Sequence, residues 1–240
     1  DQDTLHKEYV TPAGTLSTSV RLSEDWPHGD HIPFIDDYQI PRQLKPLVTE
    51  ASELPALGFM LTPPSEEDRV AFKQEAERAH AFVKEHGALL VGGWGVGMDM
   101  ASWLCGMQEL MFLAHDRPDF VEDVLEMIHQ WNVKRMEVTL SAPVDLYVRR
   151  AWYEGVDFVA RDLYRDAVLP RLKREVDLVH EHGAKCGYIC SSGAMPLRDD
   201  HLEAGIDVLI GIDPVQGTYT DMPKVREELA GKVATWGGVS

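Results

Sequence analysis

The chain has 240 residues, of which 44% are hydrophobic and 26% charged, and a formal net charge of −17. This size allows one large domain or two small ones with a sizeable core, and the acidic surface disfavours nucleic-acid and polyanionic partners. No apolar run approaches the roughly 20 residues of a membrane span. The three cysteines suit a reducing compartment, so we expect a cytoplasmic protein.

The first 64 residues are rich in proline and turn signals. Residues 15–22 alternate weakly, which indicates a strand or hairpin, and we expect a short helix over Pro41 to Thr49. We interpret residues 1–64 as an elaboration beside the main fold and not as a separate domain. Residues 1–240 are therefore predicted to form a single domain.

A regular pattern of helix, glycine and short apolar strand begins at Ser65. Ser65, with Asp68 three residues later, predicts a helix start, and Gly87 predicts its end because glycine tolerates the left-handed conformation. Residues 98–138 are expected to hold two helices, the second beginning at Pro118. The same pattern predicts five strands, at residues 89–94, 145–152, 185–190, 207–212 and 233–238.

Strands that alternate with helices predict an α/β fold with a parallel sheet. The βα units of residues 65–240 fit part of a TIM-type (β/α)8 barrel, which takes about 250 residues when complete. Because Asp1 opens in mid-sequence and Ser240 follows no obvious terminal element, we expect the barrel to be incomplete at both ends. A doubly wound open sheet is the alternative architecture.

In either architecture, functional side chains gather at the carboxyl ends of the strands. The glycine-rich segment at residues 92–97 follows a strand but matches neither the dinucleotide-binding motif nor the P-loop. Its aromatic residue, Trp94, is a candidate for substrate binding. Trp152 and Tyr153 at the end of the next strand add a large aromatic surface for the same purpose, beside the carboxylate of Glu154, a candidate catalytic residue.

Two further positions carry charge near strand ends. Arg149 and Arg150 lie on one strand, and an inward arginine can hold a substrate carboxylate bidentately. Arg149 is the candidate, and a solvated or helix-paired arginine is the alternative for at least one of the two. Asp213 ends a later strand, where a carboxylate can act as a general base or a metal ligand. The alternative is a turn or helix-capping aspartate before Pro214.

The segment at residues 186–193 contains the most informative pair. Period-two alternation places Tyr188 and Cys190 on the same side of one strand, and we expect both to face the mouth of the barrel. A thiolate at Cys190 can bind Zn²⁺ or act as a nucleophile, whereas a lone cysteine is often a small buried apolar residue. Tyr188 is a candidate catalytic residue, and Ser191, which follows the strand, is a candidate for substrate binding.

Six stretches in the second half of the chain form a series. They are Arg161–Arg165, Val168–Lys173, His180–Ala184, Tyr188–Gly193, Leu202–Leu209 and Gly231–Gly238. In their order and spacing they resemble the uroporphyrinogen decarboxylase (URO-D) superfamily, in particular its methyltransferase-like branch. The resemblance covers residues 85–240 well and the N-terminal part loosely, and it implies a (β/α)8 barrel.

The resemblance also implies a cofactor. Zinc-dependent methyltransferases of the superfamily use methylated corrinoids and bind Zn²⁺ through a His-x-Cys motif, a later acidic residue in some members and a distal cysteine. Cys190 matches the motif cysteine, and Asp213 falls where the acidic ligand could sit. Tyr188 replaces the histidine, and neutral tyrosine is a poor ligand for zinc. A distal cysteine would lie beyond Ser240.

From the resemblance we expect methyl transfer that involves a corrinoid protein or a thiol acceptor and acts on a small-molecule substrate. Uroporphyrinogen decarboxylation, which requires no cofactor, is the alternative. It ranks second because its polycarboxylate substrate needs a cationic pocket, which the net charge of −17 opposes. A non-catalytic barrel that binds a ligand or a corrinoid partner is the third possibility, and the departure at Tyr188 is its main support.

Overall fold

The structure, a computed structural model, describes residues 3–215 and 220–237. The chain divides into two compact units. The first comprises Asp1–Thr62 and Met98–Ile128, and the second comprises Pro63–Gly97 and His129–Ser240. The organisation of residues 1–240 as a single domain stays a prediction.

The first unit contains a three-stranded antiparallel sheet with the order β1-β2-β3. Its strands are β1 (Thr4–Thr11), β2 (Gly14–Arg21) and β3 (Gln43–Lys45). The predicted hairpin is confirmed, since β2 pairs with β1 along its whole length. The predicted helix at 41–49 is wrong. Ser19 pairs with Lys45 across the sheet, and a proline at position 46 disfavours a helical conformation of the residue before it.

The helices of the first unit are short. They are η1 (Asp37–Arg42), η2 (Ala51–Glu53), α1 (Leu54–Met60), α3 (Met98–Cys105), α4 (Met107–Asp116) and the beginning of α5 (Pro118–Leu140). Two helices were expected over residues 98–138 and three are present, because Gly106 has a φ of 76° and separates α3 from α4. The expected helix start at Pro118 is confirmed.

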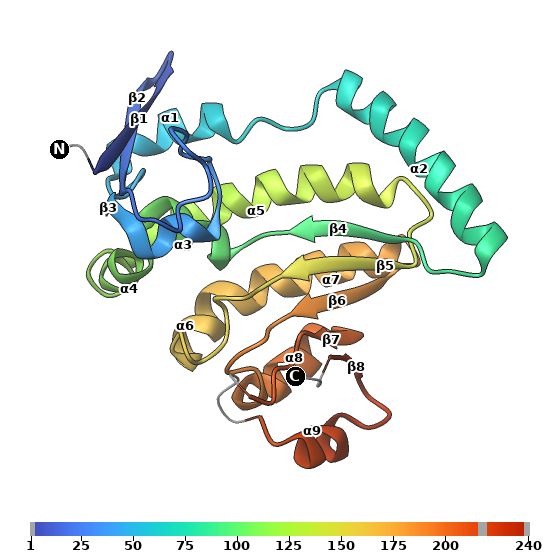
Figure 1. Ribbon diagram of the computed structural model, residues 1–240. Coiled ribbons are helices and arrows are strands. Elements are labelled where there is room, and N and C mark those ends of the chain that lie inside the picture. Colours follow the sequence, from blue (N-terminus) through green and yellow to red (C-terminus); the bar gives the residue numbers. More distant parts are fainter. Residues whose placement is uncertain (1–2, 216–219, 238–240) are drawn as a thin grey trace. The chain divides into compact units, whose positions relative to one another are not determined.

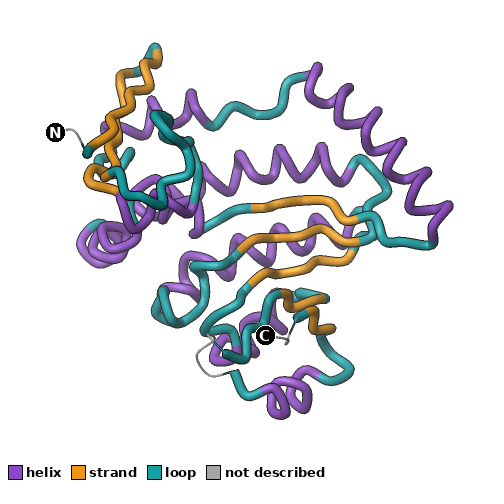
Figure 2. Tube along the Cα trace, in the orientation of Figure 1, coloured by secondary structure: helices purple, strands orange, loops and turns teal. Residues whose placement is uncertain are grey.

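The second unit is built on a parallel sheet whose strands follow one another in chain order (Figure 2). The strands are β4 (Val91–Gly95), β5 (Leu146–Arg150), β6 (Lys185–Ile189), β7 (Val208–Ile210) and β8 (Ala234–Trp236). All five predicted strands are present, and residue 238 of the last prediction lies outside the described residues. The spatial order of the strands follows the chain without reversal, as it does in a TIM-type barrel. In a doubly wound sheet the strand order reverses at one point.

Helices alternate with these strands. They are α2 (Glu66–His86), the end of α5, α6 (Arg161–Leu163), the π-helical η3 (Tyr164–Val168), α7 (Leu169–Glu181), η4 (Met195–Leu197), α8 (Arg198–Ala204) and α9 (Met222–Leu229). The predicted start of α2 is confirmed, because Ser65 and Asp68 cap each other's backbone groups. Gly87 ends the helix in the left-handed conformation, as expected. Among the described residues, none of the helices combines the length and apolar character that crossing a membrane requires.

The two faces of the parallel sheet differ in what covers them. Helix α7 runs beside β5 and β6 (Figure 1) and contacts the face that carries Arg149 and Tyr188, because Glu175 of α7 accepts a hydrogen bond from Arg149. We call this side the helix face. By alternation, Val148 and Ile189 point to the opposite side, which we call the pocket face.

Candidate functional site

A buried network of charged side chains centres on Arg149. Its Nε donates to Oε2 of Glu175 at 2.8 Å, and its Nη2 donates to Oε1 of Glu154 at 3.0 Å. All three side chains are almost inaccessible to solvent. One guanidinium thus bridges two carboxylates from different elements, the helix α7 and the loop after β5. This arrangement satisfies the rule that buried charges are paired.

Helix α5 extends the network. His129 Nδ1 lies 3.1 Å from Oε1 of Glu175, and Asn132 Nδ2 donates to the same oxygen at 3.1 Å. The other end of the Asn132 amide accepts from the backbone N–H of Val96 at 3.3 Å. Because Val96 directly follows β4, the network reaches the exits of both β4 and β5.

Tyrosines extend the network on the side of β6. The hydroxyl of Tyr188 donates to Oε2 of Glu154 at 2.6 Å, and the hydroxyl of Tyr164 donates to that of Tyr188 at 3.4 Å. The ring of His201 packs edge-on against both tyrosine rings. Its Nε2 is buried without a hydrogen-bond partner among the described residues. Burial lowers the pKa of His201 to about 4, so this ring is neutral at neutral pH.

Glu175 and Arg149 keep their charges in the folded state. Burial alone would raise the pKa of Glu175, but Arg149 and His129 outweigh it and hold that pKa below its ordinary value. Burial likewise opposes the charge of Arg149, and the two carboxylates overcome it and raise the Arg149 pKa. Burial and then the charge of Glu154 raise the pKa of Tyr188 well above its ordinary value. Tyr188 is therefore a neutral hydrogen-bond donor.

The structure brings together three of the predicted site residues, but on the helix face. Glu154, Tyr188 and Arg149 contact one another and are shielded by α7 and α5. Cys190 is fully buried on the same side, as the alternation predicted, and its thiol donates to the carbonyl oxygen of Ser192 at 3.6 Å. The expected orientation toward the barrel mouth is wrong, because these side chains pack against helices.

A sequence signal for this network exists in the helices. Leu172, Val176 and Val179 make the apolar stripe of α7, and Glu175 falls within that stripe. Asn132 likewise occupies a buried position of its helix, one turn before the buried Met136 of α5. A charged or amide residue at a core position requires a buried partner. That requirement points to an arginine of the neighbouring strand on the helix face.

The exits of β4 and β5 carry an aromatic rim. Trp94, which is 47% exposed, has a φ of 90° and sits where the β4–β5 register shifts. Its ring is edge-on to that of Trp152, with centroids 6.4 Å apart. Tyr153 packs edge-on against Phe158 at 5.3 Å. Arg150 lies with its guanidinium carbon 4.2 Å from the Trp152 ring centroid, so the arginine on the pocket face is Arg150 and not Arg149.

A cavity of about 530 Å³ lies on the pocket face and includes the Trp94 part of the rim. Its lining residues come from α2, all five strands of the parallel sheet and the end of α5, and they are Phe72, Val91, Gly92, Gly93, Trp94, Thr139, Val148, Ile189, Ile210 and Trp236. None of these lining residues, all within the described part of the chain, carries a charge. Such a cavity suits an apolar group of a small ligand.

The other predicted residues follow the ends of strands. Asp213 accepts a hydrogen bond from the backbone N–H of Val215 at 2.7 Å, the geometry of a turn aspartate. Ser191 is half-buried two residues after the end of β6. In the described residues, no group of three or more His, Cys, Asp or Glu side chains is arranged to hold a metal ion. With Tyr188 bonded to Glu154, the donors around Cys190 do not fit a zinc site.

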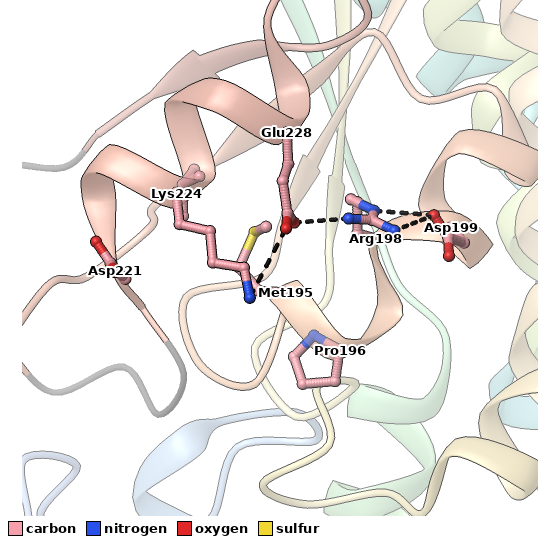
Figure 3. A pocket seen from close by; sticks show the side chains of 8 residues that line it. Met195, Pro196, Arg198, Asp199, Asp221, Lys224 and Glu228 are labelled. Carbon is pink, nitrogen blue, oxygen red and sulfur yellow. Dashed lines mark hydrogen bonds and ion pairs between the residues drawn. The ribbon is translucent and has the colours of Figure 1, made fainter.

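A second hollow, of about 240 Å³, lies between the start of α8 and α9 (Figure 3). Its charged side chains pair with one another. Arg198 contacts Glu228 at 2.7 Å and Asp199 at 2.8 Å, and Lys224 lies 3.7 Å from Glu228. Because these ion pairs neutralise the cations of the hollow, the apolar cavity on the pocket face is the better candidate for a substrate site.

Comparisons with known proteins give a family and a fold. A family model described as uroporphyrinogen decarboxylase (URO-D) matches residues 32–240. Among solved structures, a methyltransferase from Methanosarcina mazei is similar, with 16% identity and a TM-score of 0.52 over 62% of this chain and 42% of that chain. This chain thus spans less than half of that protein's length, and the likeness concerns the fold. A search of curated proteins gives no match.

Proposed function

Because the chain belongs to the uroporphyrinogen decarboxylase (URO-D) family, we propose that it forms the substrate-binding part of an enzyme that transfers a methyl group. The substrate is a small molecule held at the pocket face, with its methyl-bearing end in the apolar cavity. The observation that carries this proposal is the chemistry of that cavity, whose described lining is uncharged and, apart from Thr139 and two glycines, aromatic or aliphatic.

The same observation ranks methyl transfer above porphyrinogen decarboxylation. A polycarboxylate needs several cations near its binding site, because moving charges out of water is costly unless they are paired. The lining of the cavity is uncharged, and Arg149 is paired with two carboxylates on the opposite face of the sheet. The net charge of −17 adds a long-range repulsion for a polyanion.

In this proposal the residues of the pocket face bind and shield the substrate. Trp94 and Trp236 contact its apolar part, and Ile210 contributes to the lining of the cavity. Exclusion of water protects a reactive methyl donor from hydrolysis. A corrinoid carried by a partner protein would supply the methyl-accepting or methyl-donating chemistry. Asp213, at the end of β7, remains the proposed acid–base residue, whereas Glu154 and Tyr188 are proposed to support the site from the helix face.

The test compares the two reactions on one preparation of the protein. Loss of methylcobalamin is followed by its absorbance with a panel of small thiols, and uroporphyrinogen turnover is followed by chromatography of the porphyrins. We expect thiol-dependent demethylation of methylcobalamin and no coproporphyrinogen. Trp94→Ala is expected to lower the rate at least about tenfold, the loss that follows from about 1.4 kcal/mol of lost transition-state binding.

Phe82→Ala is the matched control, because Phe82 is also an exposed aromatic residue of the second unit and does not line the cavity. We expect this variant to keep the wild-type rate. Coproporphyrinogen formation without methyl transfer would replace the proposal by the decarboxylase alternative. Failure of both reactions, with a ligand still bound at the cavity, would favour a non-catalytic binding protein.

A further inference from the structure

We infer that Arg149 is a positioning residue, which fixes the exits of β4 and β5 and thereby the pair formed by Trp94 and Trp152, and that it does not bind substrate. The inference rests on the proposed function in one respect, namely that these tryptophans border the substrate site. The positioning itself is a property of the fold. It can therefore be tested whether or not the proposed reaction occurs.

The exit of β5 is fixed through Glu154. The backbone N–H of Glu154 donates to the carbonyl oxygen of Ala151 at 3.2 Å, so Trp152 lies inside a closed turn. The side chain of Glu154 is held by Arg149 at one oxygen and by Tyr188 at the other. One end of the turn continues β5 itself, and the other end is tied to β5 and β6 through this carboxylate. The turn that presents Trp152 therefore has both ends immobilised.

The exit of β4 is fixed through Gly97 and Val96. A Cβ atom built on Gly97 would lie 1.9 Å from Nη2 of Arg149, so the guanidinium packs directly against this backbone. The N–H of Val96 is bound by Asn132, whose amide also contacts Glu175, the second carboxylate of Arg149. The exit of β4 is therefore held, directly and through Asn132 and Glu175, by the guanidinium of Arg149.

Trp94 needs such support. A non-glycine residue with a φ of 90° is in a sparsely populated conformation, which persists only where the surroundings impose it. Arg149 suits this task because its guanidinium is planar and donates in fixed directions to two carboxylates. A buried ion pair contributes little net stability when compared with an apolar replacement, so its presence here is better explained by the geometry that it imposes on both exits.

The measurement is circular dichroism of the tryptophan pair. Two indole rings at 6.4 Å and 86° couple their electronic transitions, and the resulting far-ultraviolet couplet depends on their mutual orientation. Trp94→Phe defines the contribution of the pair by difference. The test variant is Glu154→Gln, which keeps the size of the side chain and removes the charge that Arg149 holds. All spectra are recorded on the full chain, well below the melting temperature of each variant.

Asp200→Asn is the matched control. Asp200 is also a fully buried carboxylate that contacts two arginines, Arg161 at 2.9 Å and Arg165, but it lies in α8 outside the network. We expect Glu154→Gln to lose more than half of the couplet and Asp200→Asn to retain it, even where both variants melt earlier than the wild type. Equal losses in the two variants, or a full couplet in Glu154→Gln, would overturn the inference.

A second variant covers the case in which Glu154→Gln does not fold. Glu175→Gln removes the charge that holds the guanidinium of Arg149 from the side of α7. We expect this variant to lose more than half of the couplet as well, whereas Asp200→Asn retains it. Failure of the proposed function would be visible separately, because it requires the wild-type protein to lack methyl transfer. Failure of the positioning inference is an unchanged couplet, whatever the activity.

Discussion

Arg149 Nη2 lies 3.0 Å from Oε1 of Glu154, and both side chains are buried between the parallel sheet and its helices. A strand-end arginine and a strand-end carboxylate, which by residue type resemble substrate-binding and catalytic groups, thus neutralise each other on the helix face. On the opposite side of the sheet, the cavity that remains for a ligand is lined by uncharged residues.

Removing the guanidinium is expected to be costly. Arg149→Met leaves Glu154 and Glu175 as buried carboxylates without their cation, and loss of one partner of a buried pair costs about 3–5 kcal/mol. Adding Glu175→Gln to this variant removes one uncompensated charge and should restore part of the free energy of unfolding, as measured in urea. A cost below about 1 kcal/mol for Arg149→Met would be typical of an exposed pair and would contradict the network.

At position 94 we expect glycine to give a more stable protein than alanine, which reverses the usual order of these two residues. Glycine normally destabilises a protein relative to alanine, but at a φ of 90° alanine keeps the strain and glycine relieves it. We expect Trp94→Gly to be more stable than Trp94→Ala by about 1–2 kcal/mol, with both variants impaired in activity. Thermal unfolding of the two proteins decides the matter, and a more stable alanine variant would mean that the backbone there is unstrained.

His201 makes stability depend on pH. Its folded-state pKa of about 4 lies below the value of about 6.5 for an exposed histidine. The unfolded chain therefore binds a proton between these values and the folded chain does not. The contribution of neutral His201 to the free energy of unfolding is fully present above about pH 6.5. It is lost as the pH falls toward 4, by up to about 1.4 kcal/mol per pH unit.

The variant His201→Phe isolates this contribution. Phenylalanine keeps the ring between Tyr164 and Tyr188 and cannot be protonated. Between about pH 6.5 and 4, we expect its free energy of unfolding to decline less steeply than that of the wild type. The difference in slope is up to about 1.4 kcal/mol per pH unit. Parallel pH profiles of the two proteins would show that the histidine is protonated in the folded state as readily as in the unfolded one.

Gly155 joins the exits of β5 and β6. A Cβ atom there would lie 1.8 Å from the carbonyl oxygen of Ser192, next to the hydrogen bond from Val156 N to Gly193 O at 3.1 Å. We expect Gly155→Ala to cost about 1–3 kcal/mol through overpacking. Gly58→Ala is the control, because its Cβ would make an ordinary contact of 3.5 Å with Met127 inside a helical environment. Equal stability of the two variants would rule out the close approach.

Local signals made most of the second unit predictable. Serine and aspartate at the start of α2, glycine at its end and short apolar runs after each helix are properties of neighbouring residues, and the structure has the corresponding elements in the same order. The first unit was less predictable. Gln43–Lys45 becomes a strand because β2 offers an edge to pair with, and this partner lies more than twenty residues away in the sequence.

The orientation of the strands could not be predicted in the same way. In β5 every residue from Leu146 to Arg150 is buried, so alternation groups the side chains into two sets but does not say which set meets the helices. Tyr188 and Cys190 lie on the same side of the sheet, as alternation predicts, but that side is the helix face and not the expected one. Glu175, an acidic residue within the apolar stripe of α7, was the available indication that a cation lies on the helix face.

Filling the cavity tests whether the substrate binds at the pocket face. Ile210→Trp adds bulk to the lining, and Val10→Trp makes a comparable change on an exposed strand residue of the first unit. The measurement is the rate of thiol-dependent demethylation of methylcobalamin by both variants and the wild type. We predict that Ile210→Trp loses nearly all activity while remaining folded and that Val10→Trp retains it. A folded Ile210→Trp variant with the wild-type rate would contradict the account.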